Sequence, residues 1–248
     1  MDLDVVVFAS QKGGSGKTTL SGHMAVAALR ADHGPVAVID TDPQGSLVAW
    51  AKARGRSFIS VVKHAGEPLS DEIAKLKQQG ARLVIVDTPP AANSNIVEAI
   101  RVASLVVVPT RPSPHDLRAV GSTVDIVEAC RKPMVFVVNS ATPRAKITAD
   151  AAVALSQHGT VAPITVHHRV DYAASMIDGR TVMEVGEDGR SAGEITRLWQ
   201  YLSTRLARQR EQWAEALASR PGLDQQMGHA LRRVAPAFGK RAAQAEWH

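Results

Sequence analysis

A glycine-rich segment near the N-terminus carries the residue types that bind phosphate. It reads QKGGSGKTT over residues 11–19, directly after the apolar run 5–9. A strand, a glycine turn and a Gly-Lys-Thr sequence that opens a helix form a P-loop, whose backbone N–H groups surround the phosphates of a nucleotide. Lys17 is expected to reach the β- and γ-phosphates, and Thr18 to ligate Mg²⁺. The predicted nucleotide-binding residues of this loop are Gly13, Gly14, Ser15, Gly16, Lys17, Thr18 and Thr19.

The loop departs from the usual pattern at two positions. Gln11 stands where the first glycine of a P-loop is usual, and Lys12 adds a second lysine. One lysine before the threonine is enough to hold a nucleotide. Lys12 therefore needs a role of its own.

Carboxylates follow two of the later apolar runs. The run 83–86 leads into Asp87, the position from which a carboxylate next to a P-loop holds Mg²⁺ through water. The run 36–39 leads into the sequence DTDPQG, where Asp40 and Asp42 lie within reach of a γ-phosphate and its attacking water. The same six residues are also ordinary turn chemistry. The metal ligands predicted from these residues are Thr18 and Asp87.

The remaining pattern predicts the sheet that positions these residues. Short runs rich in Val and Ile alternate with longer helical patterns, as in a mostly parallel twisted sheet covered by helices on both faces. The predicted strands are 5–9, 36–39, 58–62, 83–86, 105–108, 134–138 and 162–166, and the predicted helices are 17–30, 70–79, 96–103, 115–130 and 148–157. Right-handed crossovers then bring the carboxyl ends of the strands to one edge, where ligands bind. The fold class is α/β.

The C-terminal part has a different pattern. Apolar residues keep helical spacing from Ile195 to Leu217, Pro221-Gly222 ends this segment, and a second stripe covers 223–234. From Arg205 onward, eight basic residues stand against four acidic ones. We therefore expect a P-loop domain over 1–204 and a basic helical extension over 205–248.

Bulk composition excludes several classes of protein. The chain has 248 residues, 45% hydrophobic and 21% charged, as in a globular protein. Cys130 is the only cysteine, which excludes disulfides within the chain and cysteine-cluster metal sites. Aromatic residues make up 4%, too few for a surface that binds single strands by base stacking. The acidic start Met1-Asp2-Leu3-Asp4 does not resemble a secretion signal, so a cytoplasmic location is expected.

Three motifs in order, KGGSGKTT, DTDPQGS and VDTPP, resemble the ParA/MinD group of deviant Walker A ATPases, most closely the small plasmid-partition ParA proteins. The resemblance covers roughly 4–204. It implies that Lys12 reaches across an ATP-sandwich homodimer to the phosphates of the other subunit, where a cation neutralises developing charge. It also implies that Asp42 positions the attacking water, that Asp40 supports either the Mg²⁺ shell or the loop, and that Asn139 contacts adenine. Hydrolysis of ATP should then be slow and partner-stimulated.

Two further segments have more than one reading. Residues 109–117 resemble the family's proline-bearing loop near the nucleotide and the dimer interface, but Ser113, Pro114 and Asp116 also suit the start of a helix. His167 and His168 are adjacent on a predicted strand end and would point to opposite faces, which argues against a shared metal.

The resemblance implies an ATP-gated switch that positions a cargo, such as a plasmid, a chromosome locus or a protein assembly. The segment 167–184 is similar to the partition branch, which favours nonspecific double-stranded DNA as partner and a nucleoid-associated location. A ParB-like or small adaptor protein would stimulate hydrolysis. The alternatives are a MinD-like membrane-associated ATPase and an ATP-dependent small-molecule ligase. The predicted DNA-binding residues are Arg144, Lys146, Arg169 and Arg180.

Overall fold

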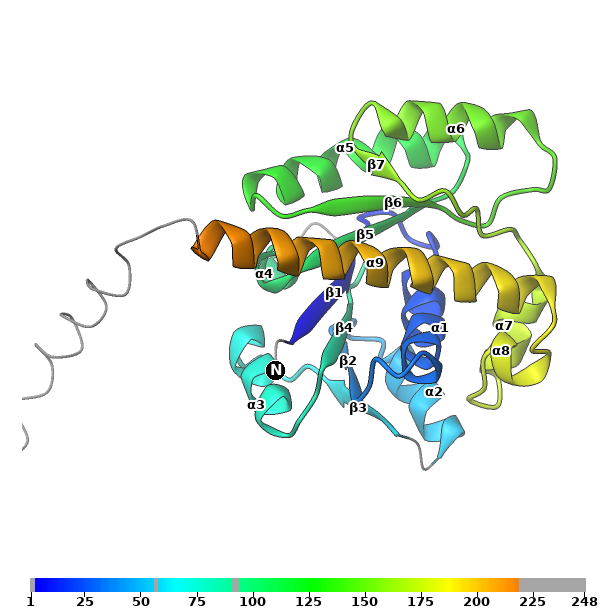
Figure 1. The fold of residues 1–248 in the computed structure, drawn as a ribbon. Helices are drawn as coiled ribbons and strands as arrows, with labels where there is room; N and C mark the ends of the chain where they lie inside the picture. The colour runs from blue at the N-terminus through cyan, green and yellow to red at the C-terminus, as the bar shows by residue number, and fades with distance from the viewer. Residues whose placement is uncertain (1–2, 56–57, 91–93, 219–248) are drawn as a thin grey trace, which may run out of the picture. The chain divides into compact units, whose positions relative to one another are not determined.

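The computed structural model describes residues 3–55, 58–90 and 94–218. Within these residues, seven strands form one sheet in the order β3-β2-β4-β1-β5-β6-β7, and every neighbouring pair is parallel (Figure 1). The strands are β1 Asp4–Phe8, β2 Val36–Asp40, β3 Ile59–Lys63, β4 Leu83–Asp87, β5 Leu105–Thr110, β6 Met134–Val138 and β7 Thr160–Val161. The predicted α/β fold with a parallel sheet is confirmed.

The helices cover both faces of the sheet. They are α1 Lys17–Arg30, α2 Ser46–Arg54, α3 Leu69–Gln78, α4 Ser94–Val102, α5 Pro114–Ala129, α6 Lys146–Ser156, α7 Val170–Met176, α8 Val182–Val185 and α9 Arg190–Ala218. One apolar cluster joins α1, α2, α8 and the first part of α9 to one face of the strands, and a second cluster joins α3, α4, α5 and α6 to the other face. Because both faces are buried, the strands are almost continuous runs of apolar residues.

The register of the strands places the predicted chemistry at one edge. Asp40 at the end of β2 and Phe8 at the end of β1 both pair with Asp87 at the end of β4. The glycine-rich loop begins just after Phe8, so the loop and both strand-end carboxylates are neighbours. This is the carboxyl edge, where open parallel sheets bind ligands.

The helix α9 explains the long apolar pattern near the C-terminus. Ile195, Leu198, Trp199, Leu202 and Leu206 recur at helical spacing and are all buried in the core. The chain divides into two compact units, Met1–Leu206 and Ala207–His248. The predicted turn at 221–222, the stripe at 223–234 and the rest of the extension lie outside the described residues.

Some predicted elements were wrong or missing. The strand expected over 162–166 is shorter and earlier, at Thr160–Val161. Pro163 has no backbone N–H and interrupts the ladder, although Ala162 and Val166 still donate backbone hydrogen bonds to β6. The helices α2, α7 and α8 were not predicted, because α7 and α8 are too short for a helical repeat and α2 has no clear apolar repeat. In the described ranges, no helix is both long and apolar enough to cross a membrane.

Candidate functional site

The glycine-rich loop is shaped by a contact with the end of β6. Asn139 follows β6, and its side-chain Nδ2 donates a hydrogen bond to the carbonyl oxygen of Ser15, 2.7 Å away. Gly16 has a φ of 95°, and a Cβ at this position would lie 2.1 Å from Asn139 Nδ2. Glycine is therefore required at position 16 both for its backbone angle and for the close approach. Asn139, which was predicted to contact adenine, therefore holds the loop in place. It also lines a cavity beside the loop.

Gln11 replaces the usual first glycine because it anchors the loop to α5. Its backbone N–H donates to Thr123 Oγ1 at 3.3 Å, and its side-chain Nε2 donates to the carbonyl oxygen of Ser122 at 3.2 Å. A glycine could not make the second of these contacts. The departure from the usual pattern therefore fixes the start of the loop.

The two lysines of the loop lie in different surroundings. Lys17 is buried, and its Nζ donates to the carbonyl oxygens of Ser10 at 3.0 Å and Lys12 at 3.3 Å. Burial lowers the pKa of Lys17, against the attraction of Asp87 and Asp42. The Lys12 side chain is exposed. Lys17 is thus placed to serve its own loop, whereas Lys12 faces outward.

The loop has unused hydrogen-bonding capacity that fits a phosphate. Ser15 Oγ is buried and has no hydrogen-bond partner among the residues that the structure describes. In the part of the chain that the structure describes, the Lys17 ammonium donates to two carbonyl oxygens, which a more strongly bound anion can replace. A nucleotide phosphate would supply acceptors for both groups.

Thr18 and Asp87 form an oxygen-rich group beside the loop. Asp87 is fully buried and accepts hydrogen bonds from Thr18 Oγ1 at 2.7 Å and Ser21 Oγ at 3.3 Å. Burial raises the pKa of Asp87 to about 7, with the charge of Asp40 adding to the effect, while Thr18, Lys17 and Ser21 oppose it. Hydroxyl and carboxylate oxygens are the ligands that Mg²⁺ prefers. These residues fit the predicted metal site.

Asp40 has a different set of contacts. Its Oδ2 accepts the backbone N–H groups of Leu47 and Val48 at the start of α2, at 3.0 and 3.1 Å, and its Oδ1 accepts the N–H of Asp42 at 3.1 Å. Burial raises the pKa of Asp40, and these three hydrogen bonds oppose it. Of the two roles open for Asp40, the geometry favours support of the loop.

Asp42, for which a water-positioning role was predicted, lies beside the glycine-rich loop. Its side chain is half-buried and lines the same cavity as Lys17 and Thr18. Asp42 Oδ1 accepts the backbone N–H of Gln44 at 3.0 Å. That hydrogen bond holds the carboxylate at the mouth of the loop.

These residues share one cavity of about 370 Å³. Part of its wall is the loop and Asp42, and another part is the segment that follows β7. The complete lining is Gly14, Gly16, Lys17, Thr18, Thr19, Leu20, Asp42, Thr88, Pro90, Arg111, Asn139, Ser140, Val166, His167, His168, Arg169, Tyr172 and Ala173. The cavity has room for a nucleotide whose phosphates lie on the loop.

The segment 109–117 starts a helix and also reaches the cavity. Ser113 Oγ accepts the backbone N–H of Asp116 at 3.1 Å and caps α5, with Pro114 as the first helical residue. Arg111, just before this cap, lines the cavity. The helix start is therefore also part of the site.

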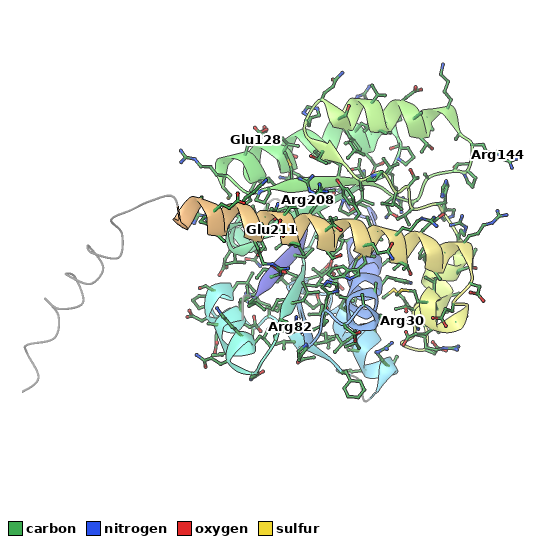
Figure 2. All side chains as sticks on the ribbon, in the orientation of Figure 1. Arg30, Arg82, Glu128, Arg144, Arg208 and Glu211 are labelled. Carbon is green, nitrogen blue, oxygen red and sulfur yellow. The ribbon has the colours of Figure 1, made fainter. Side chains whose placement is uncertain are left out.

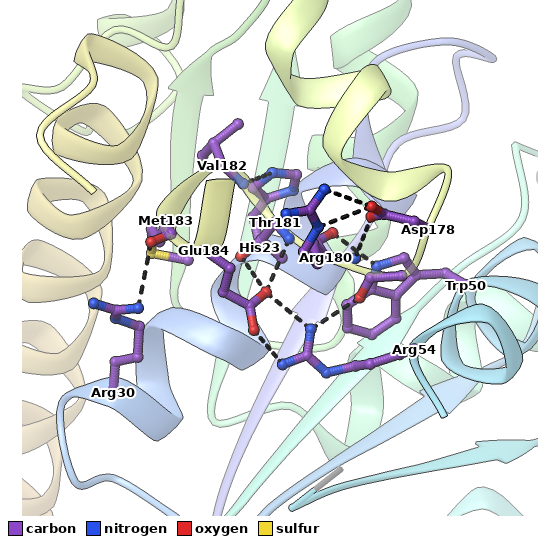
Figure 3. A network of polar contacts seen from close by, with 11 residues as sticks. His23, Arg30, Trp50, Arg54, Asp178, Arg180, Thr181, Val182, Met183 and Glu184 are labelled. Atoms are coloured by element: carbon purple, nitrogen blue, oxygen red, sulfur yellow. Dashed lines mark hydrogen bonds and ion pairs between the residues drawn. The ribbon is translucent and has the colours of Figure 1, made fainter. Parts of the chain in front are cut away.

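The helix α2 connects the Asp42 loop to the segment 178–184 (Figure 3). Arg54 makes two hydrogen bonds to Glu184, at 2.5 and 2.9 Å, and Trp50 Nε1 donates to the carbonyl oxygen of Arg180 at 3.2 Å. Gly179 has a φ of 80°, and a Cβ there would lie 2.1 Å from the backbone nitrogen of Arg54. The end of α2 is therefore fixed on this segment.

His23 makes the corresponding connection from α1. It is fully buried, its Nδ1 lies 2.8 Å from the carbonyl oxygen of Thr19, and its Nε2 accepts the backbone N–H of Val182 at 3.3 Å. The ring must then be neutral, with its proton on Nδ1. Burial lowers the pKa of His23 to about 4, against the Thr19 hydrogen bond and the charge of Glu184.

This arrangement predicts a loss of stability in acid. Unfolded His23 takes up a proton near its ordinary pKa of 6.5, whereas folded His23 does so only near 4. Stability is therefore fully present above pH 6.5 and falls as the pH drops towards 4, by on the order of 3 kcal/mol. Urea unfolding of wild type and His23→Gln at several pH values should show a flatter profile for the variant. His115→Gln, at an exposed histidine, is the control, and equal profiles for wild type and His23→Gln would contradict the assignment.

The four predicted DNA-binding residues do not share one environment. Arg144, just before α6, and Lys146, its first residue, are both exposed. Arg144 projects from the surface in Figure 2. Arg180 is exposed and pairs with Asp178 at 2.6 Å. Arg169 instead lines the cavity and pairs with Glu194 at 2.7 Å.

Sequence reasoning missed part of the site. His167, His168 and Tyr172 line the cavity, although the histidine pair was considered only as a metal site or a surface segment. The available signal was position, since these residues follow the last predicted strand at the carboxyl edge of the sheet. Ser21, which donates to Asp87, lies one helical turn after Thr18.

Comparisons with known proteins agree with this geometry. Residues 6–182 match the family described as the CobQ/CobB/MinD/ParA nucleotide binding domain. The chain is 30% identical to the maintenance of carboxysome distribution protein A of Halothiobacillus neapolitanus, over 75% of this chain and 89% of that protein. It is 35% identical to the protein ParA of Rhizobium radiobacter, over 46% of this chain and 51% of that protein.

Solved structures share the fold at low sequence identity. The MinD cell division protein of Aquifex aeolicus has a TM-score of 0.67 at 16% identity and covers 81% of this chain and 97% of its own. The ATP complex of a variant of Cyanothece McdA has a TM-score of 0.64 at 16% identity, with coverage of 81% and 96%. Together with the family match over most of the domain, these findings show that the chain belongs to the ParA/MinD family of P-loop ATPases.

Proposed function

We propose that this chain is an ATP-dependent dimerising switch that binds nonspecific DNA in its ATP state and is released by slow hydrolysis. The observation that carries the proposal is the different burial of the two lysines in the glycine-rich loop. Lys17 is buried and its Nζ donates to carbonyl oxygens of its own loop, whereas the Lys12 side chain is exposed. An exposed cation on the phosphate-binding loop can serve a second subunit.

The cycle needs ATP and Mg²⁺. Lys17, the loop glycines and Ser15 would hold the phosphates, and Thr18 with Asp87 would hold the metal. Bound Mg²⁺ would neutralise charge on the phosphates. Asp42 would position the attacking water, and no strong base lies among the predicted catalytic residues, which fits slow turnover.

We propose that the helix α2 transmits a change at the nucleotide to the surface that binds DNA. The Asp42 loop leads directly into α2, and α2 is fixed to the segment that carries the exposed Arg180 (Figure 3). A change at Asp42 can therefore shift the segment that carries Arg180. Arg144, Lys146 and Arg180 form the proposed DNA contacts, and Arg169 is left out because it lies in the cavity wall.

The proposed cargo rests on the names of two similar proteins. One relative is named for maintenance of carboxysome distribution and another is named ParA. We propose that this chain likewise positions a cargo, either a DNA molecule or a protein assembly, on the nucleoid in the cytoplasm. A ParB-like or small adaptor protein would link the cargo to the switch and stimulate hydrolysis.

Co-sedimentation tests the proposal directly. Wild-type protein is mixed with nonspecific duplex DNA or with anionic liposomes, each with ATP, a non-hydrolysable analogue, ADP or no nucleotide. DNA binding only with the triphosphates is expected. Binding to liposomes but not DNA would contradict it and favour a MinD-like membrane role, and capture by neither would favour a small-molecule ligase.

The salt dependence of DNA binding tests the contact residues. Each phosphate contact that is lost should reduce the slope of log affinity against log salt by about 0.9, so Arg144→Ala with Lys146→Ala should reduce it by about 2. Arg82→Ala is the matched control, because Arg82 is exposed just before β4, at the opposite edge of the sheet (Figure 2). An unchanged slope in the double variant would remove these residues from the DNA surface.

A further inference from the structure

A single carboxylate on α9 holds one wall of the cavity. Glu194 Oε1 lies 2.8 Å from His167 Nδ1, and Oε2 accepts the backbone N–H of His167 at 3.1 Å. The same Oε2 accepts Arg169 Nη1 at 2.7 Å and the Tyr172 hydroxyl at 2.9 Å. The cavity wall after β7 is therefore fastened to α9 by four hydrogen bonds, and the first turns of α9 lie beside α7 in Figure 1.

Glu194 itself does not line the cavity, whereas all three of its partners do. Its side chain is only 6% exposed, so it acts from behind the wall. Burial would raise the pKa of Glu194, but the hydrogen bonds from Arg169, His167 and Tyr172 outweigh it and lower the pKa. The carboxylate is therefore ionised at neutral pH and holds its donors strongly.

The cavity wall after β7 also contacts α1, the helix that follows the glycine-rich loop. The Tyr172 ring packs edge-on against His23 of α1, with ring centres 5.4 Å apart. His23 in turn contacts the carbonyl oxygen of Thr19, which lines the cavity next to Thr18. By holding Tyr172, Glu194 therefore also fixes the position of the wall relative to the glycine-rich loop.

The location of the wall indicates which part of a nucleotide it meets. The phosphates belong on the glycine-rich loop, so the nucleoside must lie against the rest of the lining. That part includes Asn139, Ser140 and six residues of the segment that follows β7. Three of the side chains available there are the ones that Glu194 holds.

We propose that Glu194 is a positioning residue for the nucleoside half of ATP. It fixes His167, Arg169 and Tyr172 in the geometry that receives the base and ribose, without touching them itself. The inference rests on the proposed ATP-dependent function.

A second glutamate offers a matched control. Glu184 is partly buried, pairs with an arginine as Glu194 does, and accepts hydrogen bonds from Thr181. Its partners Arg54 and Thr181 do not line the nucleotide cavity. Glu184→Gln therefore disturbs a comparable ion pair away from the nucleoside wall.

Calorimetric titration with two probes tests the proposal. Mg-ATP engages the loop and the wall, whereas Mg-tripolyphosphate engages the loop alone. In Glu194→Gln, the affinity for Mg-ATP should fall about tenfold, about 1.4 kcal/mol, while that for tripolyphosphate stays within about twofold. The KM for ATP should rise with kcat nearly unchanged, and Glu184→Gln should bind both probes like wild type.

A second variant guards against a failure of Glu194→Gln to fold. Tyr172→Phe keeps the ring against His23 but removes the hydroxyl that donates to Glu194, and should weaken Mg-ATP binding about threefold with no effect on tripolyphosphate. Equal losses for both probes, or no loss for Mg-ATP in either variant, would overturn the proposal. If wild type binds tripolyphosphate but not ATP, the proposed function fails first, and the inference fails with it.

Discussion

Replacing Lys12 with alanine should lower ATP turnover by about 100-fold or more, with Mg-ATP affinity changed by no more than about threefold. The Lys12 side chain is exposed and only its carbonyl oxygen contacts Lys17, so its removal leaves the loop intact. The lost interaction is the one that the partner subunit would receive in the transition state. Phosphate release gives the turnover and calorimetry gives the affinity.

The same variant should fail to dimerise on ATP and fail to bind DNA. Lys77→Ala, at an exposed lysine of α3, is the control and should behave as wild type. If Lys12→Ala turns over ATP normally, then Lys12 has no role across the dimer, and the proposed switch loses its main support.

Replacing Asp42 with alanine should also abolish most turnover, by about 100-fold or more, but with the opposite effect on DNA. Asp42 lines the cavity, and its loss removes the group that we propose to position water while Lys12 and Lys17 remain. The ATP-bound dimer should then persist on DNA. Dissociation from immobilised duplex after ATP is washed out measures this persistence.

Asp42→Asn separates the chemistry from the shape of the loop. Asparagine can still accept the Gln44 N–H, which Asp42 Oδ1 accepts at 3.0 Å, so the turn should be kept. Both variants should be slow and persistent on DNA. A variant that hydrolyses ATP at the wild-type rate would exclude Asp42 from catalysis, and one that no longer binds ATP would make Asp42 a structural residue.

The sequence predicted the elements whose cause is local. The strand ending in Asp87 is a buried apolar run, and the loop at 11–19 has its own glycines, so both were recognisable without tertiary information. The pairing of Asp40 and Phe8 with Asp87 then follows from parallel strands that end at one edge. These elements contain most of the predicted phosphate and metal site.

The rest depends on contacts between distant segments. The role of Asp40 was left open because it is set by the N-terminus of α2, a short helix without a clear apolar repeat. The ion pair of Arg169 could not be predicted, because its partner Glu194 lies 25 residues away on another helix. The role of Gln11 could not be predicted either, because the acceptors of its hydrogen bonds lie on the distant helix α5.

The most direct test of the central claim is the mass of the protein in solution in each nucleotide state. Light scattering on Asp42→Ala should give twice the 26.4 kDa chain mass with Mg-ATP and a single chain mass with Mg-ADP. Adding Lys12→Ala to the same protein should keep it a single chain even with Mg-ATP. A mass that does not depend on the nucleotide, or an ATP dimer that forms without Lys12, would contradict the account.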